Sequence, residues 1–369
     1  MANFLSSLFK KGESSVLGID IGSSAIKVVQ LRKKGGKAVL ETYGALALGP
    51  YAKLEIGRAT NLPVEKVVEA LADILREAKT TSKTAGMSIP FSSSLMTVIE
   101  LPRVDDKQMA QMVPIEARKY VPVPIGEVTL DWTIIPKPAG EEESETNALG
   151  GKKVPKADVL LVAIHNDTIK EHQEIVQKAA LNVNFFEIEI FSTIRSVLDQ
   201  NNAPAMILDM GAATTKLYVV ERGIVRASHT VSRGSQDITS AIAAGLGIPV
   251  DRAEIMKRTI GLTPDANNKS LADMITVNLD FIFSEARHVL TNYQARRKKS
   301  VEKVVLVGGG AAMKGFAEVA QKNLEAPVVL GDPFGRVEAP AFLTDTLRKT
   351  GPEFAVAIGI ALRRLLSEE

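Results

Sequence analysis

Two segments of the chain, residues 16–31 and 205–220, repeat one pattern of apolar, acidic and small residues. Each reads as two buried strands joined by a tight turn, VLGIDIGSSAIKVVQL in the first case and AMILDMGAATTKLYVV in the second. The two align without a gap, so every residue of the first segment is separated from its match in the second by the same number of positions. An internal repeat of this kind predicts a fold of two homologous halves. The superposed residues are Asp20 on Asp209, Gly22 on Gly211 and Lys27 on Lys216.

The residues around each segment extend the repeat to a larger structural unit. An apolar stretch after each pair predicts a third strand, and apolar residues at helical spacing then predict a helix. In the first unit Asn61 and Pro63 are placed as helix start signals. The predicted strands are residues 16–22, 25–32 and 38–48 in the first half and 205–211, 214–220 and 224–230 in the second, with helices from residue 64 and from about residue 235.

The turn inside each repeat has the composition of a phosphate-binding loop. The sequences DIGSS from Asp20 and DMGAAT from Asp209 both place an acidic residue at a strand end, before glycine and small residues. Small residues let backbone N–H groups approach phosphates, hydroxyls add donors, and an aspartate suits the cation that neutralises the phosphates. One such turn is a weak signal, because strands often end in Asp-x-Gly. Two turns in register favour one phosphate site shared by both halves.

A third glycine-rich element follows the second repeat. Residues 304–307 predict a buried strand that runs into Gly308-Gly309-Gly310, before a predicted helix over residues 311–324. Glycines at such a place allow the backbone to pack closely against an aromatic ring or a phosphate. A triple glycine alone is more often a tight turn. Here it completes a pattern that the two repeats began.

The segment between the repeats, residues 86–180, predicts a small α+β subdomain. Within it residues 137–156 are polar and rich in Gly and Pro, which predicts a surface loop. After the second repeat, helices predicted over residues 251–258 and 270–299 form another lobe. The elements predicted in the α+β subdomain are strands around residues 95–101, 128–135 and 159–164 and helices around residues 106–120 and 168–180.

Composition argues against several functional classes. Basic and acidic residues nearly cancel, leaving a formal charge of +2, so the overall charge does not favour a nucleic-acid partner. Cysteine is absent, which removes disulfides, thiol catalysis and cysteine-type zinc sites. The longest apolar stretch, residues 354–362, is about half of the roughly 20 residues that cross a bilayer. We therefore expect no membrane span, and the order of apolar and basic residues over residues 4–11 does not predict a secretion signal.

Two phosphate turns, a glycine-rich turn and helices expected at residues 189–198 and 354–366 resemble the superfamily of actin, sugar kinases and Hsp70. The segment between the repeats carries a second set of motifs, Ile99-Glu100-Leu101-Pro102, Glu116-Ala117, Tyr120-Val121-Pro122-Val123-Pro124 and Val128-Thr129-Leu130-Asp131. In these residues it resembles, more narrowly, the PilM family of cytoplasmic actin-like proteins of type IV pilus assembly, and more distantly the cell-division protein FtsA.

The resemblance implies an α/β fold of the actin-like (ribonuclease H-like, duplicated) ATPase type, with an inserted small α+β subdomain as in FtsA and PilM. It also implies a division into four parts. These are subdomain 1A at residues 1–85 with 181–203 and 353–369, subdomain 1C at residues 86–180, subdomain 2A at residues 204–246 and 300–352, and subdomain 2B at residues 247–299.

The resemblance further implies one ATP or ADP with Mg²⁺, and it assigns roles to residues of the site. Asp20 and Asp209 are expected near the magnesium through water, and Glu189 is the catalytic candidate that orients the attacking water or the metal shell. A solvated glutamate at a helix start is the alternative for Glu189. The expected nucleotide contacts are Gly22, Ser23, Ser24 and Lys27 in the first turn, Gly211, Ala212, Ala213, Thr214, Thr215 and Lys216 in the second, Glu254 and Lys257 at the ribose, and Gly308, Gly309, Gly310 and Ala311 at the adenine.

The implied function is that of a cytoplasmic ATP-binding adaptor recruited to the inner membrane through a partner, at most a slow ATPase. Its expected partner is the N-terminal cytoplasmic tail of a PilN-like inner-membrane protein, with other pilus-motor proteins and self-association left open. A filament-forming division protein like FtsA and a small-molecule kinase of the same superfamily are the alternatives. The residues expected to bind the partner are Leu101, Pro102, Tyr120, Val121 and Val123.

Overall fold

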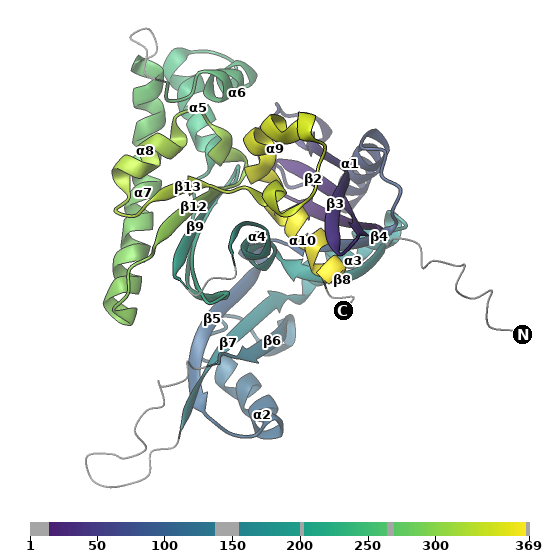
Figure 1. The fold of residues 1–369 in the computed structure, drawn as a ribbon, viewed down its shortest axis with the longest axis vertical. Coiled ribbons are helices and arrows are strands. Elements are labelled where there is room, and N and C mark those ends of the chain that lie inside the picture. Colours follow the sequence, from purple (N-terminus) through teal and green to yellow (C-terminus); the bar gives the residue numbers. More distant parts are fainter. Residues whose placement is uncertain (1–14, 137–154, 200–202, 264–268, 367–369) are drawn as a thin grey trace, which may run out of the picture. The chain divides into compact units, whose positions relative to one another are not determined.

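The computed structural model describes residues 15–136, 155–199, 203–263 and 269–366 (Figure 1). The chain divides into two compact units, a larger one of residues 1–90 and 174–369 and a smaller one of residues 91–173. The N-terminal residues 4–11 and most of the polar segment 137–156, on which the sequence raised expectations, lie outside the described residues.

Two five-stranded sheets of identical topology form the larger unit. In each sheet three consecutive strands pair antiparallel, and two later strands add in parallel on the other side of the first strand of that trio. The predicted duplication is therefore confirmed. In spatial order the first sheet is β3 (Lys37–Ala47), β2 (Ala25–Lys34), β1 (Ser15–Ile21), β4 (Thr84–Ile89) and β8 (Asn182–Ile188), and the second is β11 (Ile224–Val231), β10 (Thr215–Glu221), β9 (Ala205–Met210), β12 (Lys303–Val307) and β13 (Val328–Leu330).

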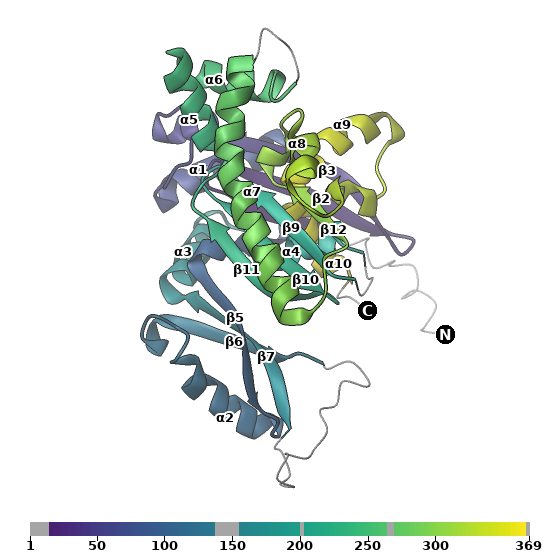
Figure 2. The same ribbon diagram turned by 90° about the vertical axis from the view of Figure 1, so that its left-hand side faces the viewer.

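Helices cover both faces of the first sheet, which explains why its central strands are apolar throughout. Leu17 and Ile19 of β1 belong to a core with α1 (Val64–Glu77), whereas Val16 belongs to a second core with α10 (Ala355–Leu366). The alternation follows from the two-residue period of a strand. In the second sheet, the core around Met206 and Leu208 includes residues of α5 (Ser235–Leu246), α7 (Lys269–Arg297) and α8 (Phe316–Asn323). Figure 2 shows α7 lying along this sheet.

Helix α4 (Glu189–Val197) crosses α10, and glycine makes the close crossing possible. A Cβ atom built on Gly359 of α10 would lie 1.9 Å from the backbone oxygen of Ser192 in α4. A Cβ atom on Gly18 of β1 would lie 1.9 Å from the backbone oxygen of Ala357 in α10. No side chain fits at either place, so β1, α10 and α4 are stacked backbone to backbone.

The smaller unit is a three-stranded antiparallel sheet with one helix on it. The strands lie in the order β5 (Ser94–Pro102), β7 (Lys156–His165), β6 (Val128–Ile134). Helix α2 (Asp106–Ala117) is capped at its N-terminus by Asp105, whose side chain accepts a hydrogen bond from the backbone N–H of Gln108. Its apolar face packs on Ile99 and Leu161 of the sheet. The remaining helices are α3 (Asn166–Lys178), α6 (Val250–Thr259) and α9 (Thr344–Thr350).

Some boundaries differ from those expected. The predicted helix over residues 311–324 begins only at Phe316, because a 3-10 turn (Gly309–Ala312) comes first and Gly315 has a positive φ of 77°. Strands β4 and β8, which sequence analysis did not predict, lie in the first sheet. The bounds of the four subdomains stay predictions.

Replacing Gly359 tests the crossing of α4 and α10. We expect Gly359→Ala to destabilise the protein by about 2 kcal/mol or more, because the added methyl group overlaps the Ser192 backbone oxygen. This corresponds to a fall in Tm of about 4 °C or more by calorimetry. Gly309→Ala is the matched control, since nothing lies within 4 Å of a Cβ atom there. Equal Tm values for the two variants would contradict the account of the crossing.

Candidate functional site

A cavity of about 300 Å³ lies between the two halves of the larger unit, at the small end of the range of ligand pockets. It brings together most of the residues predicted at the site, but Thr215 and Ala311 are buried and do not line it. The Thr215 hydroxyl instead donates to the backbone oxygen of Arg233. The predicted residues that line the cavity are Asp20, Gly22, Ser23, Ser24, Lys27, Glu189, Asp209, Gly211, Ala212, Ala213, Thr214, Lys216, Glu254, Lys257, Gly308, Gly309 and Gly310.

The two turns that face the cavity have the same internal geometry. In the first, the N–H of Gly22 donates to the oxygen of Ala25 at 3.0 Å. In the second, the N–H of Gly211 donates to the oxygen of Thr214, also at 3.0 Å. A Cβ atom on either glycine would lie within 3.1 Å of that oxygen, which explains glycine in both turns. The turns are thus equivalent in structure as well as in sequence.

An aspartate and a lysine face each other at the end of each hairpin. Asp20 is opposite Lys27 across β1 and β2, and Asp209 is opposite Lys216 across β9 and β10. The Nζ–Oδ2 distances are 3.6 Å in the first pair and 3.4 Å in the second. Residues opposite each other in antiparallel strands have neighbouring side chains, so the register alone creates both pairs. Ser88 of β4 also donates to Asp20 Oδ1 at 2.9 Å.

Glu189, the first residue of α4, joins the second pair. Lys216 Nζ donates to Glu189 Oε2 at 2.8 Å, so this lysine bridges two carboxylates. Burial raises the pKa of Glu189, and the nearby charges of Asp209 and Asp20 raise it further while Lys216 opposes them. Burial acts to lower the pKa of Lys216, but the carboxylates outweigh it and raise that pKa overall. The ammonium group therefore stays charged and holds the carboxylates together.

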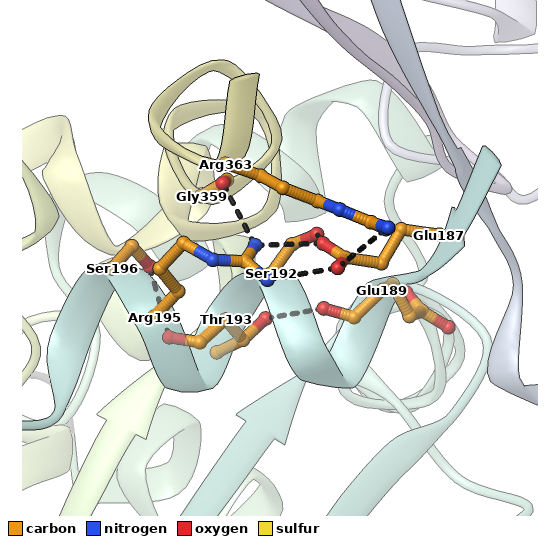
Figure 3. A network of polar contacts seen from close by, with 8 residues as sticks. All are labelled: Glu187, Glu189, Ser192, Thr193, Arg195, Ser196, Gly359 and Arg363. Carbon is orange, nitrogen blue, oxygen red and sulfur yellow. Dashed lines mark hydrogen bonds and ion pairs between the residues drawn. The ribbon is translucent and has the colours of Figure 1, made fainter. Parts of the chain in front are cut away.

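The start of α4 is held on its other side by a second ion cluster, shown in Figure 3. Arg195 binds the buried carboxylate of Glu187 with both terminal nitrogens, at 2.7 and 2.8 Å, and Arg363 of α10 binds it at 2.9 Å. Ser192 also donates to Glu187, and Arg195 donates to the backbone oxygen of Gly359 at 3.0 Å. Two-pronged arginine contacts fix orientation as well as distance. This cluster fixes α4 against α10, and its central carboxylate, Glu187, lies two residues before Glu189 in the sequence.

A polar cluster on α5 and α6 forms another side of the cavity. The buried Glu254 carboxylate accepts hydrogen bonds from Thr239 at 2.6 Å and Arg258 at 2.7 Å, and its distance to Lys257 Nζ is 2.6 Å. Burial acts to raise the pKa of Glu254, but Lys257 and the other two donors outweigh it and lower that pKa. The carboxylate is therefore ionised and rigidly held.

The glycine run after β12 packs on the second turn. Gly308 has a φ of +86°, and a Cβ atom on it would lie 2.5 Å from Asp209 Oδ1. A Cβ atom on Gly310 would lie 2.5 Å from the Met210 side chain. Only Gly309 faces open space. Two of the three glycines are thus required by contact with the end of β9, a reason that sequence analysis did not identify.

The donor set fits a magnesium ion that keeps part of its water shell. The carboxylates of Asp20, Asp209 and Glu189 line one cavity, and Mg²⁺ in nucleotide sites takes one or two carboxylates together with waters and phosphates. Within the residues that the structure describes, no group of three or more His, Cys, Asp or Glu side chains is close enough to hold a metal ion directly. The arrangement therefore suits contact through water.

Sequence analysis missed several residues that line the cavity. Thr193 lies one helical turn after Glu189, a spacing that places both on one face of α4 and could have identified it. Gly57 carried no such signal, because it belongs to a loop far along the chain from the repeats' turns. The other missed residues include Ser235, Ile238, Arg258, Met313, Lys349, Thr350, Pro352, Glu353 and Val356.

The residues expected to bind a partner lie in the smaller unit but differ in exposure. Leu101 and Val121 are buried in its core, and Val123 packs against that core. Pro102 and Tyr120 are exposed. The set therefore has two exposed members, one half-buried member, Val123, and two buried ones, and the role of the whole set stays a prediction.

The duplicated sheets and shared cavity are those of the actin-like ATPase fold, as the sequence predicted. A chain of the solved PilM–PilN type IV pilus biogenesis complex superposes with a TM-score of 0.77 and 25% identity, covering 95% of this chain and 98% of that one. MreB5 of Spiroplasma citri, solved with bound AMPPNP, superposes with a TM-score of 0.53 and 12% identity, covering 97% and 98%.

The family follows from the sequence. The model of the type IV pilus assembly protein PilM matches residues 18–365, so the chain belongs to the PilM family. FtsA of Neisseria meningitidis serogroup B is 22% identical over 345 residues, which cover 85% of this chain and 82% of that protein. No helix in the described ranges is long and apolar enough to cross a membrane.

Removing the bridging lysine tests the electrostatics of the site. We expect Lys216→Met to destabilise the protein by about 3–5 kcal/mol near neutral pH, because buried carboxylates lose their counter-charge. The pKa of Glu189 is already raised by burial, so the folded variant binds a proton at a pH where the unfolded chain has lost it. Its stability should therefore increase as the pH falls from neutral toward about 4.3, the ordinary pKa of a glutamate.

The measurement is Tm against pH by calorimetry, with Lys27→Met as the matched control. Among the residues that the structure describes, Lys27 pairs with one carboxylate, that of Asp20 at 3.6 Å, so that variant should lose less stability and recover less in acid. A loss in Lys216→Met that does not change with pH would show that the uncompensated carboxylates are not its cause.

Proposed function

We propose that this PilM-family chain binds one Mg²⁺–ATP or Mg²⁺–ADP in the cavity and acts as a cytoplasmic adaptor in type IV pilus assembly. The observation that carries the first part is the convergence of two equivalent turns, each with its Asp–Lys pair, on one cavity. A ligand held from two sides by small-residue turns, with lysines and aspartates beside them, has the chemistry of a metal-bound polyphosphate.

Each element has a distinct role in this proposal. The two turns present backbone N–H groups and the hydroxyls of Ser23, Ser24 and Thr214 to phosphates. Asp20 and Asp209 support the magnesium through water, and the ion neutralises phosphate charge. Glu254 and Lys257 contact the ribose, while the turn at Gly309 faces the base. The nucleotide thus touches both halves at once.

Hydrolysis in this arrangement is expected to be slow. Glu189 is our candidate to orient an attacking water, but its carboxylate is already engaged by Lys216. General-base assistance is typically worth about 10²- to 10⁴-fold in rate. A carboxylate tied to a buried ammonium group supplies little of that, so the proposed role is binding rather than turnover.

The adaptor role rests on family membership and on the solved PilM–PilN complex. In our proposal the smaller unit contributes to binding the short N-terminal cytoplasmic tail of a PilN-like membrane protein, and the chain is recruited to the inner membrane through it. Tyr120, which is 43% exposed, is the strongest candidate contact, because an exposed aromatic side chain is often a hot spot of an interface.

Replacing the two aspartates tests nucleotide binding. We expect Asp20→Ala and Asp209→Ala each to weaken Mg²⁺–ADP affinity at least about tenfold in titration calorimetry, which is roughly 1.4 kcal/mol. Both variants should also lose part of the magnesium dependence, since support of the ion is what they remove. Asp280→Ala, at an exposed position on α7, is the control and should bind normally. Unchanged affinity in both site variants would place the ligand elsewhere.

Replacing Tyr120 tests the partner site. We expect Tyr120→Ala to weaken binding of a synthetic peptide of the PilN-like tail by about tenfold or more, with nucleotide affinity unchanged. Phe342→Ala is the matched control, because Phe342 is an aromatic residue of the larger unit with 84% exposure. If Tyr120→Ala binds the peptide as well as the control does, the proposed contact is wrong.

A further inference from the structure

A loop between β3 and α1 is attached at both ends to the first turn of the cavity. The N–H of Leu48 donates to the oxygen of Ser24 at 2.9 Å, and the N–H of Thr60 donates to the oxygen of Ser23 at 2.8 Å. Between these points the chain makes a 3-10 turn and then continues through residues 54–60, which we call the strap. The strap is therefore an extension of the first turn rather than an independent loop.

The middle of the strap contacts the other half of the larger unit. The N–H of Ala59 donates to Gln236 Oε1 at 3.0 Å, and Arg58 Nη1 donates to Ser240 Oγ at 3.2 Å. Both acceptors lie on α5, the helix that follows the second repeat. These two hydrogen bonds link the halves beside the cavity.

Gly57 brings the strap to the cavity itself. It lines the cavity and has a φ of +92°, a conformation that side chains other than glycine rarely adopt. A Cβ atom on it would lie 2.9 Å from Glu254 Cδ. Glu254 has little freedom to move away, because Thr239 and Arg258 hold its carboxylate. Any larger residue at position 57 must therefore displace the strap.

The same contacts connect the two phosphate-type turns to each other. Gln236, which accepts from the strap, donates its own backbone N–H to the oxygen of Ala212 in the second turn at 3.0 Å. A continuous path thus runs from Ser23 through Thr60 and Ala59 to Gln236 and then to Ala212. Separation of the turns must break the bond between Ala59 and Gln236, because that bond is the step of the path that crosses from one half to the other.

We propose that the strap controls nucleotide exchange by closing across the two halves when a nucleotide holds the turns together. This inference rests on the proposed nucleotide site and names its regulation. A ligand that contacts both turns favours the state in which the strap bonds are formed, and by linkage those bonds slow its release. One of these hydrogen bonds joins two neutral groups, the other comes from the Arg58 guanidinium, and both are only partly buried. Together they are weak enough to open repeatedly, so the strap delays exchange without preventing it.

The test is the rate at which radiolabelled ADP, bound with Mg²⁺ to the full chain, is released into excess unlabelled ADP. We expect Gln236→Ala and Gly57→Ala each to release ADP about three- to tenfold faster than the unmodified protein, which corresponds to the loss of one or two such hydrogen bonds. The first removes the acceptor of Ala59, and the second displaces the strap from Glu254.

Gly223→Ala is the matched control for Gly57→Ala. Gly223 also has a positive φ, +74°, but lies in the exposed turn between β10 and β11 with nothing within 4 Å of a Cβ atom. It should release ADP at the normal rate. In Gly57→Ala the backbone at position 57 is strained, so a second variant is needed that leaves the backbone conformation unstrained. Arg58→Ala removes the side-chain hydrogen bond to Ser240 and should also speed release.

The outcomes separate this inference from the proposed function. Faster release in Gln236→Ala and Arg58→Ala, with normal release in Gly223→Ala, supports the strap. Normal release in both Gln236→Ala and Arg58→Ala overturns it and leaves the proposed nucleotide binding intact. No binding of ADP by the unmodified protein overturns both.

Discussion

The contact on which the site depends is the bridge from Lys216 to Glu189 and Asp209. It joins the end of the second hairpin to the first residue of α4, the helix that crosses α10. Without the lysine, buried carboxylates of three separate elements would face one another. With it, they form an acidic wall of a cavity that glycine-rich turns, basic side chains and apolar residues complete.

The equivalent lysine of the first half is not used in the same way. Lys27 contacts Asp20 at a longer distance, and Ser88 supplies the shorter contact to that carboxylate. The duplication therefore supplies two similar turns, while α4 makes the halves unequal. Because of this asymmetry, the second half holds the buried carboxylates through Lys216. The first half, in our proposal, slows nucleotide release through the strap.

Much of the fold could be predicted from the sequence because each copy of the repeat is a hairpin whose paired residues lie close together in the chain. Strand register places Asp20 beside Lys27 and Asp209 beside Lys216, so two matching hairpins already define the two walls of the site. Contacts between distant segments could not be predicted in this way. Gly57 against Glu254 and Gly359 against Ser192 depend on how segments far apart in the sequence pack together, which no periodicity encodes. The buried positions of Leu101 and Val121 likewise follow from the packing of α2 on its sheet.

The central claim, that one nucleotide is held by both turns together, is tested most directly by amide hydrogen exchange of the full chain with and without Mg²⁺–ADP. The account predicts slower exchange on nucleotide addition in residues 22–25 and in residues 211–214, with the same dependence on nucleotide concentration. Slower exchange at one turn only, or at neither turn when the protein is saturated, would contradict it.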